Sequence, residues 1–151
     1  MPVDDQIMDT LRIPREPAPV AKLLGMKLAS AGPGLATFTM DVDERHHNPM
    51  GSVHGGILGD LADAAMGYAV ISTLAPDETF TTVEYKVNFL RPAFEGSLRC
   101  HARVDTRGKT IAYAVADILN EEGKVVAKAV STNLIVQRAG STDPFHHKPK
   151  P

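Results

Sequence analysis

The sequence has a single cysteine, Cys100, and no tryptophan among its 151 residues. One cysteine excludes an intrachain disulfide and a cysteine-rich zinc site. Cys100 lies in a run of alternating apolar residues, a pattern typical of a thiol in the core of a strand rather than of a nucleophile. The six histidines form no convincing metal-ligand set, because the adjacent His46 and His47 would point apart. We therefore expect no bound metal.

Long hydrophobic runs and a large net charge are also lacking. No window approaches 18 uncharged apolar residues, so no transmembrane helix is expected. The acidic start, Met1–Gln6, lacks the apolar segment of a signal peptide, which leaves a cytoplasmic protein as the expectation. A net charge of -2 gives no general attraction to nucleic acid or to anionic membranes, so neither is expected as a partner.

The length and the apolar fraction of 43% predict one globular domain with a substantial core. Residues 1–20 carry several prolines and acids and are predicted to form an arm over the domain, with a short helix over Asp4–Leu11. Ala21–Gly25 is predicted to be a helical turn ended by glycine. The domain itself spans 21–137. The tail, 138–151, is polar and broken by prolines, and we expect it to be disordered.

Alternating apolar and polar residues predict half-buried strands. The strand candidates are Leu35–Val42, Val83–Phe89, Leu98–Val104, Ile111–Val115 and the β-branched segment Val126–Val136. In the second candidate, Val83, Tyr85, Val87 and Phe89 are predicted to share one face, and Pro92 closes the strand. Glycine-bearing turns at Thr106–Lys109 and Asn120–Gly123 predict hairpins, so the four strands after the helix are expected to run antiparallel in succession.

A mostly apolar helix is predicted over about Gly55–Leu74. Because apolar residues occupy most of its circumference, this helix must be wrapped rather than laid on a surface. The predicted fold class is therefore α+β, with a curled antiparallel sheet around one long central helix, and with one or two strands before that helix.

A polar loop, His47–Gly56, leads directly into this helix. Helix N-termini offer unpaired N–H donors and a positive dipole end, and both suit an oxyanion. Asp63 lies two turns inside the helix, and on a helical wheel it falls within about 80° of Gly59, Gly67 and Val70. Glycine inside a helix costs about 1 kcal/mol relative to alanine, so this stripe indicates close approach of another backbone or of a ligand.

Several of these residues also have purely structural interpretations. His54 is favoured as a residue that shapes the turn over a general base. Asn48 forms an Asx turn, or it orients a substrate carbonyl or a water. Gly55 and Gly56 are helix-entry glycines, or they present an N–H to a ligand at contact distance. Asp60 lies near Asp63 on the helix, and like-charge repulsion between them would raise one pKa.

The run Asn48-x-x-Gly51-x-x-His54-Gly55-Gly56, followed by Leu61-x-Asp63, resembles the signature of a known family. The family is that of the hotdog-fold acyl-CoA thioesterases of the phenylacetic-acid-degradation (PaaI-like) type. The resemblance covers about residues 20–137 and includes the order of the elements. It implies a hotdog domain, a dimer whose sheets join into one, often doubled to a homotetramer, and thioester hydrolysis.

Carried onto this sequence, the resemblance implies a role for each residue of the signature. The Gly55 N–H polarises the thioester carbonyl, and Asp63 is the nucleophile or general base. Asn48 helps to place the carbonyl or the attacking water, and His54 supports the loop. Thr82 falls where the family often has a hydroxyl residue that assists the water. Coenzyme A belongs to the substrate, and no other cofactor is implied.

Two further expectations concern partners of the site. Coenzyme A carries phosphates, and the basic candidates for binding them are Arg91, Arg107 and Lys109. For each of these cations, a solvated surface charge remains the alternative. Gly56 is also expected to contact the substrate. Gly55 and Asp63 are separated by about 12 Å along one helix, although both must reach the same reacting centre. We therefore expect two chains to share each site.

Two other functions fit a hotdog domain. The first is a module that binds acyl-CoA without hydrolysing it, against which the presence of Asp63 argues. The second is a hydratase, whose Asp and His lie five residues apart, as Asp41 and His46 do here. Asp41 belongs to an alternating strand, which makes that match look accidental. The acyl group, aryl or medium-chain, is left open.

Overall fold

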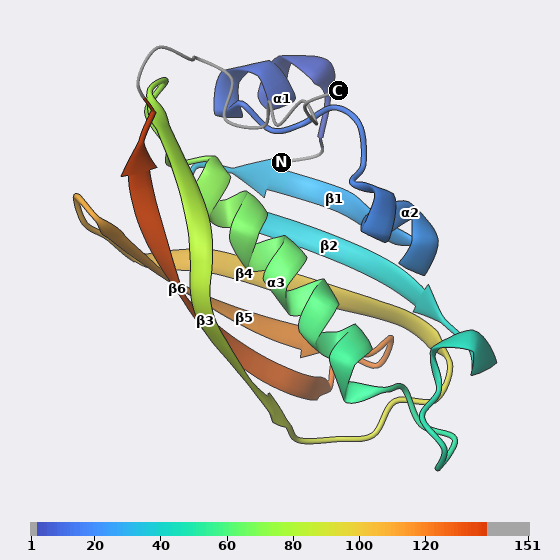
Figure 1. Cartoon of the computed structure of the whole chain (residues 1–151). Coiled ribbons are helices and arrows are strands. Elements are labelled where there is room, and N and C mark those ends of the chain that lie inside the picture. Colours follow the sequence, from blue (N-terminus) through green and yellow to red (C-terminus); the bar gives the residue numbers. More distant parts are fainter. Residues whose placement is uncertain (1–2, 139–151) are drawn as a thin grey trace, which may run out of the picture.

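A computed structural model describes residues 3–138 of the chain and shows a curved sheet around one long helix (Figure 1). The sheet has six antiparallel strands in the order β1-β2-β4-β5-β6-β3. The strands are β1 (Met26–Gly32), β2 (Leu35–Val42), β3 (Glu78–Phe89), β4 (Gly96–Arg107), β5 (Ile111–Leu119) and β6 (Val125–Gln137). The central helix is α3 (Gly55–Ile71), so the curled antiparallel sheet predicted from the sequence is confirmed.

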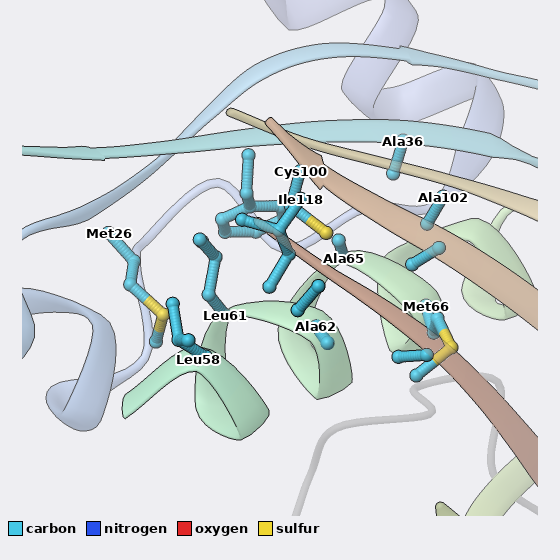
Figure 2. Close-up of a cluster of buried hydrophobic side chains, with 14 of the residues drawn as sticks. Met26, Ala36, Leu58, Leu61, Ala62, Ala65, Met66, Cys100, Ala102 and Ile118 are labelled. Carbon is cyan, nitrogen blue, oxygen red and sulfur yellow. The ribbon is translucent and has the colours of Figure 1, made fainter. Parts of the chain in front are cut away.

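The sheet surrounds helix α3 and buries the apolar residues that occupy most of its circumference. Leu61, Ala62 and Ala65 are fully buried, as is Met66 one position further along the helix. Figure 2 shows these side chains packed against Cys100 and other residues of the strands. Much of the facing surface is alanine, which allows the strands to approach the helix closely. Burial raises the pKa of the Cys100 thiol to about 12, in agreement with a core cysteine.

The N-terminal arm covers the far end of α3. Its helices are α1 (Asp5–Leu11) and α2 (Pro19–Leu24), and between them Ile13 is buried against Ala31 of β1 and Ile71 at the end of α3. Gly25 ends α2 in the left-handed conformation, with φ +79°. Both short helices were predicted from the sequence. The predicted tail lies outside the described residues, apart from Arg138.

Strand β3 departs from the expected succession of strands. It pairs with β6 at the edge of the sheet, whereas β4, β5 and β6 follow one another as hairpins. The two hairpins have short turns, and Gly123 takes a positive φ of 74° in the second. The longer segment 90–95 between β3 and β4, interrupted by Pro92, crosses instead to the other side of β5 and β6.

The predicted face of β3 is also wrong for one residue. The ladder to β6 is regular from Glu78 to Thr82 and again from Glu84 to Phe89, with a β-bulge at Val83. A bulge adds one residue and so reverses the alternation beyond it. Thr82 therefore points to α3, together with Tyr85 and Phe89, while Val83 is 63% exposed.

Helix α3 ends at Ile71, three residues before the predicted end. The Ser72 hydroxyl donates to the Ala69 carbonyl and the Thr73 hydroxyl to the Val70 carbonyl, which satisfies two of the final carbonyl groups. No helix among residues 3–138 is both long enough and apolar enough to cross a membrane.

Candidate active site

Asn48 organises the loop that enters α3. Its side-chain oxygen accepts hydrogen bonds from the backbone N–H groups of Met50 (2.9 Å) and Ser52 (3.3 Å), and its amide nitrogen donates to the Ser52 hydroxyl (3.0 Å). This is the Asx-type turn that one interpretation of the sequence predicted. Gly51 completes it with φ +84°, a conformation that favours glycine.

His54 caps the helix. Its Nδ1 accepts a hydrogen bond of 2.9 Å from the Gly56 N–H, a contact of the kind expected of a residue that shapes the turn. The same bond occupies the N–H of Gly56, which leaves Gly56 without a free backbone donor for a ligand. The Gly55 N–H has no acceptor within the described chain. It thus stands alone at the positive end of a 17-residue helix.

The glycine stripe of α3 lies against the aromatic side chains of β3. A Cβ at Gly55 would lie 2.8 Å from the Phe89 ring, and one at Gly59 would lie 2.9 Å from the Tyr85 hydroxyl. The close approach is therefore made by side chains of the same chain. The second backbone that the spacing suggested is not needed to explain the stripe.

Asp63 projects from the same face of α3, where the bulge in β3 brings Thr82 to meet it. The Thr82 hydroxyl lies 3.3 Å from Asp63 Oδ1, and both residues are half-buried. Partial burial raises the pKa of Asp63, the Thr82 hydrogen bond lowers it by a smaller amount, and Asp60 adds a small further rise. The carboxyl group thus binds a proton more readily than an ordinary aspartate, which suits a general base near neutral pH.

Behind Thr82 lie two polar residues that sequence analysis missed. Asn133 and Ser131 of β6 are each 1% exposed, and Asn133 Oδ1 lies 3.2 Å from the Thr82 hydroxyl. Asparagine is depleted in strands, so its presence in a β-branched segment was a usable signal. Its distance from Asp63 along the chain hid the connection, because only the β3–β6 register sets Asn133 opposite Thr82.

The predicted site residues fall into separate groups. Asp63 and Thr82 meet, whereas Gly55 begins the helix that carries Asp63 eight residues further on, about 12 Å away along its axis. Arg91 follows the Phe89 end of β3. Arg107 is at the opposite end, because its guanidinium pairs with Glu78 at the start of β3, and the exposed Lys109 lies in the adjoining hairpin.

The structure argues against the hydratase alternative, because the histidine that it requires, His46, is buried and hydrogen-bonded. His46 is 6% exposed, and its two ring nitrogens contact the backbone N–H of Asp43 (3.1 Å) and the carbonyl of Leu24 (3.2 Å). Neither nitrogen is free to act on a substrate. Among residues 3–138, no group of three or more His, Cys, Asp or Glu side chains is arranged to hold a metal ion.

Comparison with known proteins shows the family to which the chain belongs. A sequence model of the Thioesterase superfamily matches residues 50–127. Acyl-coenzyme A thioesterase PaaI of Escherichia coli K12 is 38% identical over 109 residues, which are 71% of this chain and 75% of PaaI. Human acyl-coenzyme A thioesterase 13 is 33% identical over 116 residues, or 74% of this chain and 81% of the human protein.

The solved structures show the same relationship. The E. coli PaaI protein from the phenylacetic acid degradation operon superposes with a TM-score of 0.72 and 34% sequence identity, covering 82% of this chain and 86% of PaaI. The chain belongs to the Thioesterase superfamily, and it is a thioester hydrolase with the hotdog fold.

Proposed function

We propose that the chain is an acyl-CoA thioesterase, which hydrolyses an aryl- or medium-chain acyl-CoA to the free acid and coenzyme A without a further cofactor. One observation carries the proposal: the half-buried carboxyl group of Asp63, which has a raised pKa, projects from a helix whose first N–H, that of Gly55, has no acceptor among residues 3–138. The first group suits activation of water. The second suits a carbonyl oxygen that gains negative charge.

In the proposed reaction, the Gly55 N–H donates a hydrogen bond to the thioester carbonyl oxygen. Such a donor contributes about 3–4 kcal/mol to the attack. As general base, Asp63 takes a proton from water while the oxygen of that water bonds to the carbonyl carbon. The C–S bond then breaks, and the proton passes to the departing thiolate. As nucleophile, Asp63 instead attacks the carbonyl carbon and displaces the coenzyme A thiolate. Water then hydrolyses the resulting mixed anhydride to the free acid and Asp63, and the proton released by that water passes to the thiolate. The geometry is compatible with both routes.

Two chains are needed to complete this site, because Gly55 and Asp63 of one helix lie too far apart to reach one carbonyl. Strand β3 supports a dimer, since it is an edge strand of twelve residues. Its exposed apolar side chains, continued by the segment that follows, are Val83 (63%), Tyr85 (43%), Phe89 (57%) and Leu90 (59%). Long apolar edges of this kind pair with another strand.

The contacts of α3 also specify how two β3 strands would pair. Gly55 lies beside Phe89, and Asp63 lies beside Thr82. Antiparallel pairing with Phe89 opposite Thr82 of the partner subunit then brings Gly55 of one chain to Asp63 of the other. The same pairing carries Lys109 of the partner subunit toward Arg91, where the two cations can hold coenzyme A phosphates. Arg107 is less suited to that role because Glu78 already neutralises it.

The experiment that tests the proposal is a panel of aryl- and medium-chain acyl-CoA thioesters assayed for release of free thiol. The wild type is expected to hydrolyse some of them, and Asp63→Asn is expected to lose the activity. Asp60→Asn is the matched control, because Asp60 lies one turn away and is exposed. Equal thiol release by the wild type and Asp63→Asn would contradict the proposal. Tight binding without hydrolysis would indicate the binding module instead.

A further inference from the structure

Asn133 occupies an unusual position on the inner face of β6. Its neighbours on that face include Ala129 and Ile135, and burying an amide there is unfavourable unless its hydrogen bonds are made. The amide nitrogen donates both of its hydrogens, to the Ala112 carbonyl (3.3 Å) and to the Ser131 hydroxyl (2.9 Å). These two acceptors fix the orientation of the amide. Its oxygen, which can only accept, therefore faces Thr82.

The Thr82 hydroxyl lies between two acceptors. Asp63 Oδ1 is 3.3 Å away and Asn133 Oδ1 is 3.2 Å away. A hydroxyl has one hydrogen, so it donates to only one of them at a time. When Asp63 is ionised, donation to its carboxylate is the stronger bond, because the acceptor carries a charge.

We propose that Asn133 is a positioning residue that lets the Thr82 hydroxyl reverse its hydrogen bond when Asp63 takes up a proton. This inference rests on the proposed function of Asp63. Protonated Asp63 donates its new O–H to Thr82 Oγ1, and Thr82 turns its own hydrogen to Asn133 Oδ1. Both hydrogen bonds are then made. The proton on Asp63 comes from the attacking water, whose O–H bond breaks as its oxygen bonds to the carbonyl carbon, and no other covalent bond of the protein changes.

The hydrogen bonds from Asp63 to Thr82 and from Thr82 to Asn133 thus stabilise protonated Asp63. This is the state of Asp63 after water has lost its proton and before the thiolate receives one. Without the oxygen of Asn133, the Thr82 hydrogen has only Asp63 as its partner at this point. Thr82 then stays a donor, which favours ionised Asp63 and works against its action as a base. Asn133 has no contact with the bound substrate in this scheme, so its effect falls on kcat rather than on KM.

Few other charges surround Asp63 within residues 3–138. Asp60 on the same helix is the one whose charge affects it. The other titratable side chains directed at α3 are Tyr85 of β3 and Cys100 of β4. Strands β2, β5 and β6 present alanines, other apolar residues, Ser131 and Asn133 to the helix. The Thr82–Asn133 pair is therefore the main polar contact that can respond to protonation of Asp63.

The test compares the pH dependence of kcat/KM for acyl-CoA hydrolysis in four variants. Asn133→Leu is expected to move the acid limb to lower pH, with kcat reduced about threefold to tenfold and KM unchanged. Thr82→Val removes the hydrogen bond to ionised Asp63, so the limb is expected to move to higher pH. The double variant should match Thr82→Val, because Asn133 acts through Thr82. Thr82→Ser, which keeps the hydroxyl, should keep the acid limb near its wild-type pH.

Three controls separate the possible failures. Ile135→Ala perturbs the same face of β6 at a position opposite Phe80 rather than Thr82, and its acid limb should not move. Asn133→Ser, whose shorter side chain does not reach Thr82, should behave as Asn133→Leu does. A carbon-13 NMR titration of the Asp63 carboxyl group reports the same shifts without using activity. Failure of both Asn133 variants to fold would overturn the proposal, because Asn133 would then serve the core rather than the site.

The outcomes also distinguish this inference from the function on which it rests. If Asp63→Asn remains active, the proposed function fails. If Asp63 is essential but Asn133→Leu leaves the acid limb in place, only the role of Asn133 fails. The role of Asn133 also fails if Asn133→Leu still moves the acid limb when Thr82 has already been replaced by valine.

Discussion

At Asp63, the catalytic role that we propose would come with a cost to stability. Its carboxyl group is half-buried on α3, and burial is the largest cause of its raised pKa. Ionised Asp63 therefore carries a desolvation penalty in the folded chain that it does not carry in the unfolded chain. In the role proposed for Asp63, the same raised pKa makes its carboxylate a better base.

The pH dependence of activity should follow from this shift. As the pH falls through the raised pKa, Asp63 takes up a proton, and in the proposed reaction it can then no longer accept one from water. The acid limb of kcat/KM is therefore expected at a higher pH than an ordinary aspartate would give. Asp60→Asn should move it to lower pH by removing the repulsion. A limb that coincides with the ordinary aspartate value would contradict this account.

The contribution of Asp63 to the free energy of unfolding should become more favourable as the pH falls, whereas the activity should fall. Because the folded-state pKa of Asp63 is raised, the penalty is present above that pKa and vanishes below the unfolded value of 3.8. Asp63→Asn should thus be inactive yet more stable than the wild type at pH 7. The gain should shrink as the pH falls, which thermal unfolding across pH can measure. A variant that is less stable at pH 7 would argue against a buried charge.

The N–H of Gly55 can be tested with a matched pair of substitutions. Both Gly55→Ala and Gly55→Pro place a Cβ against Phe89, but only proline removes the N–H. Proline is accepted at the first position of a helix, so α3 should form in both. We expect kcat for Gly55→Pro to fall about 100-fold to 1000-fold below that of Gly55→Ala. Equal rates would show that this N–H is not the oxyanion donor.

At the scale of elements, the contact between α3 and β3 positions the site. The bulge at Val83 turns Thr82 toward Asp63, and the glycines of α3 leave room for Phe89 and Tyr85. A strand without the bulge would place Thr82 and Tyr85 on opposite faces. Sequence alternation could not show this, because an added residue changes the register without changing the composition.

The two inner glycines of α3 should respond differently to alanine. A Cβ at Gly67 meets Phe80 at 3.5 Å, an ordinary contact, whereas one at Gly59 meets the Tyr85 hydroxyl at 2.9 Å. Gly67→Ala should raise the free energy of unfolding by about 0.5–1 kcal/mol through helix propensity. Gly59→Ala should gain less, and adding Tyr85→Phe should restore the difference. Denaturant unfolding measures all three, and equal gains for both glycines would contradict the packing described.

At the scale of the whole molecule, local signals predicted most of the fold. The glycine turns, the glycine that ends α2 and the loop before α3 depend on residues close together in sequence, and so does the expectation that His54 shapes the turn into α3. The pairing of β3 with β6 and the contact between Thr82 and Asn133 depend on distant segments. A single sequence contains no signal for the register between β3 and β6. The predicted sharing of the site is likewise a property of two chains rather than of one.

Sharing of the site between two chains is the central claim, and coexpression of two inactive variants tests it most directly. Asp63→Asn lacks the base and Gly55→Pro lacks the N–H donor, so each homodimer should be inactive. A heterodimer pairs Gly55 of one chain with Asp63 of the other and regains one intact site. With random pairing, acyl-CoA thiol release should return to about a quarter of the wild-type level. Activity no higher than that of the separate variants, with heterodimers shown to be present, would contradict the account.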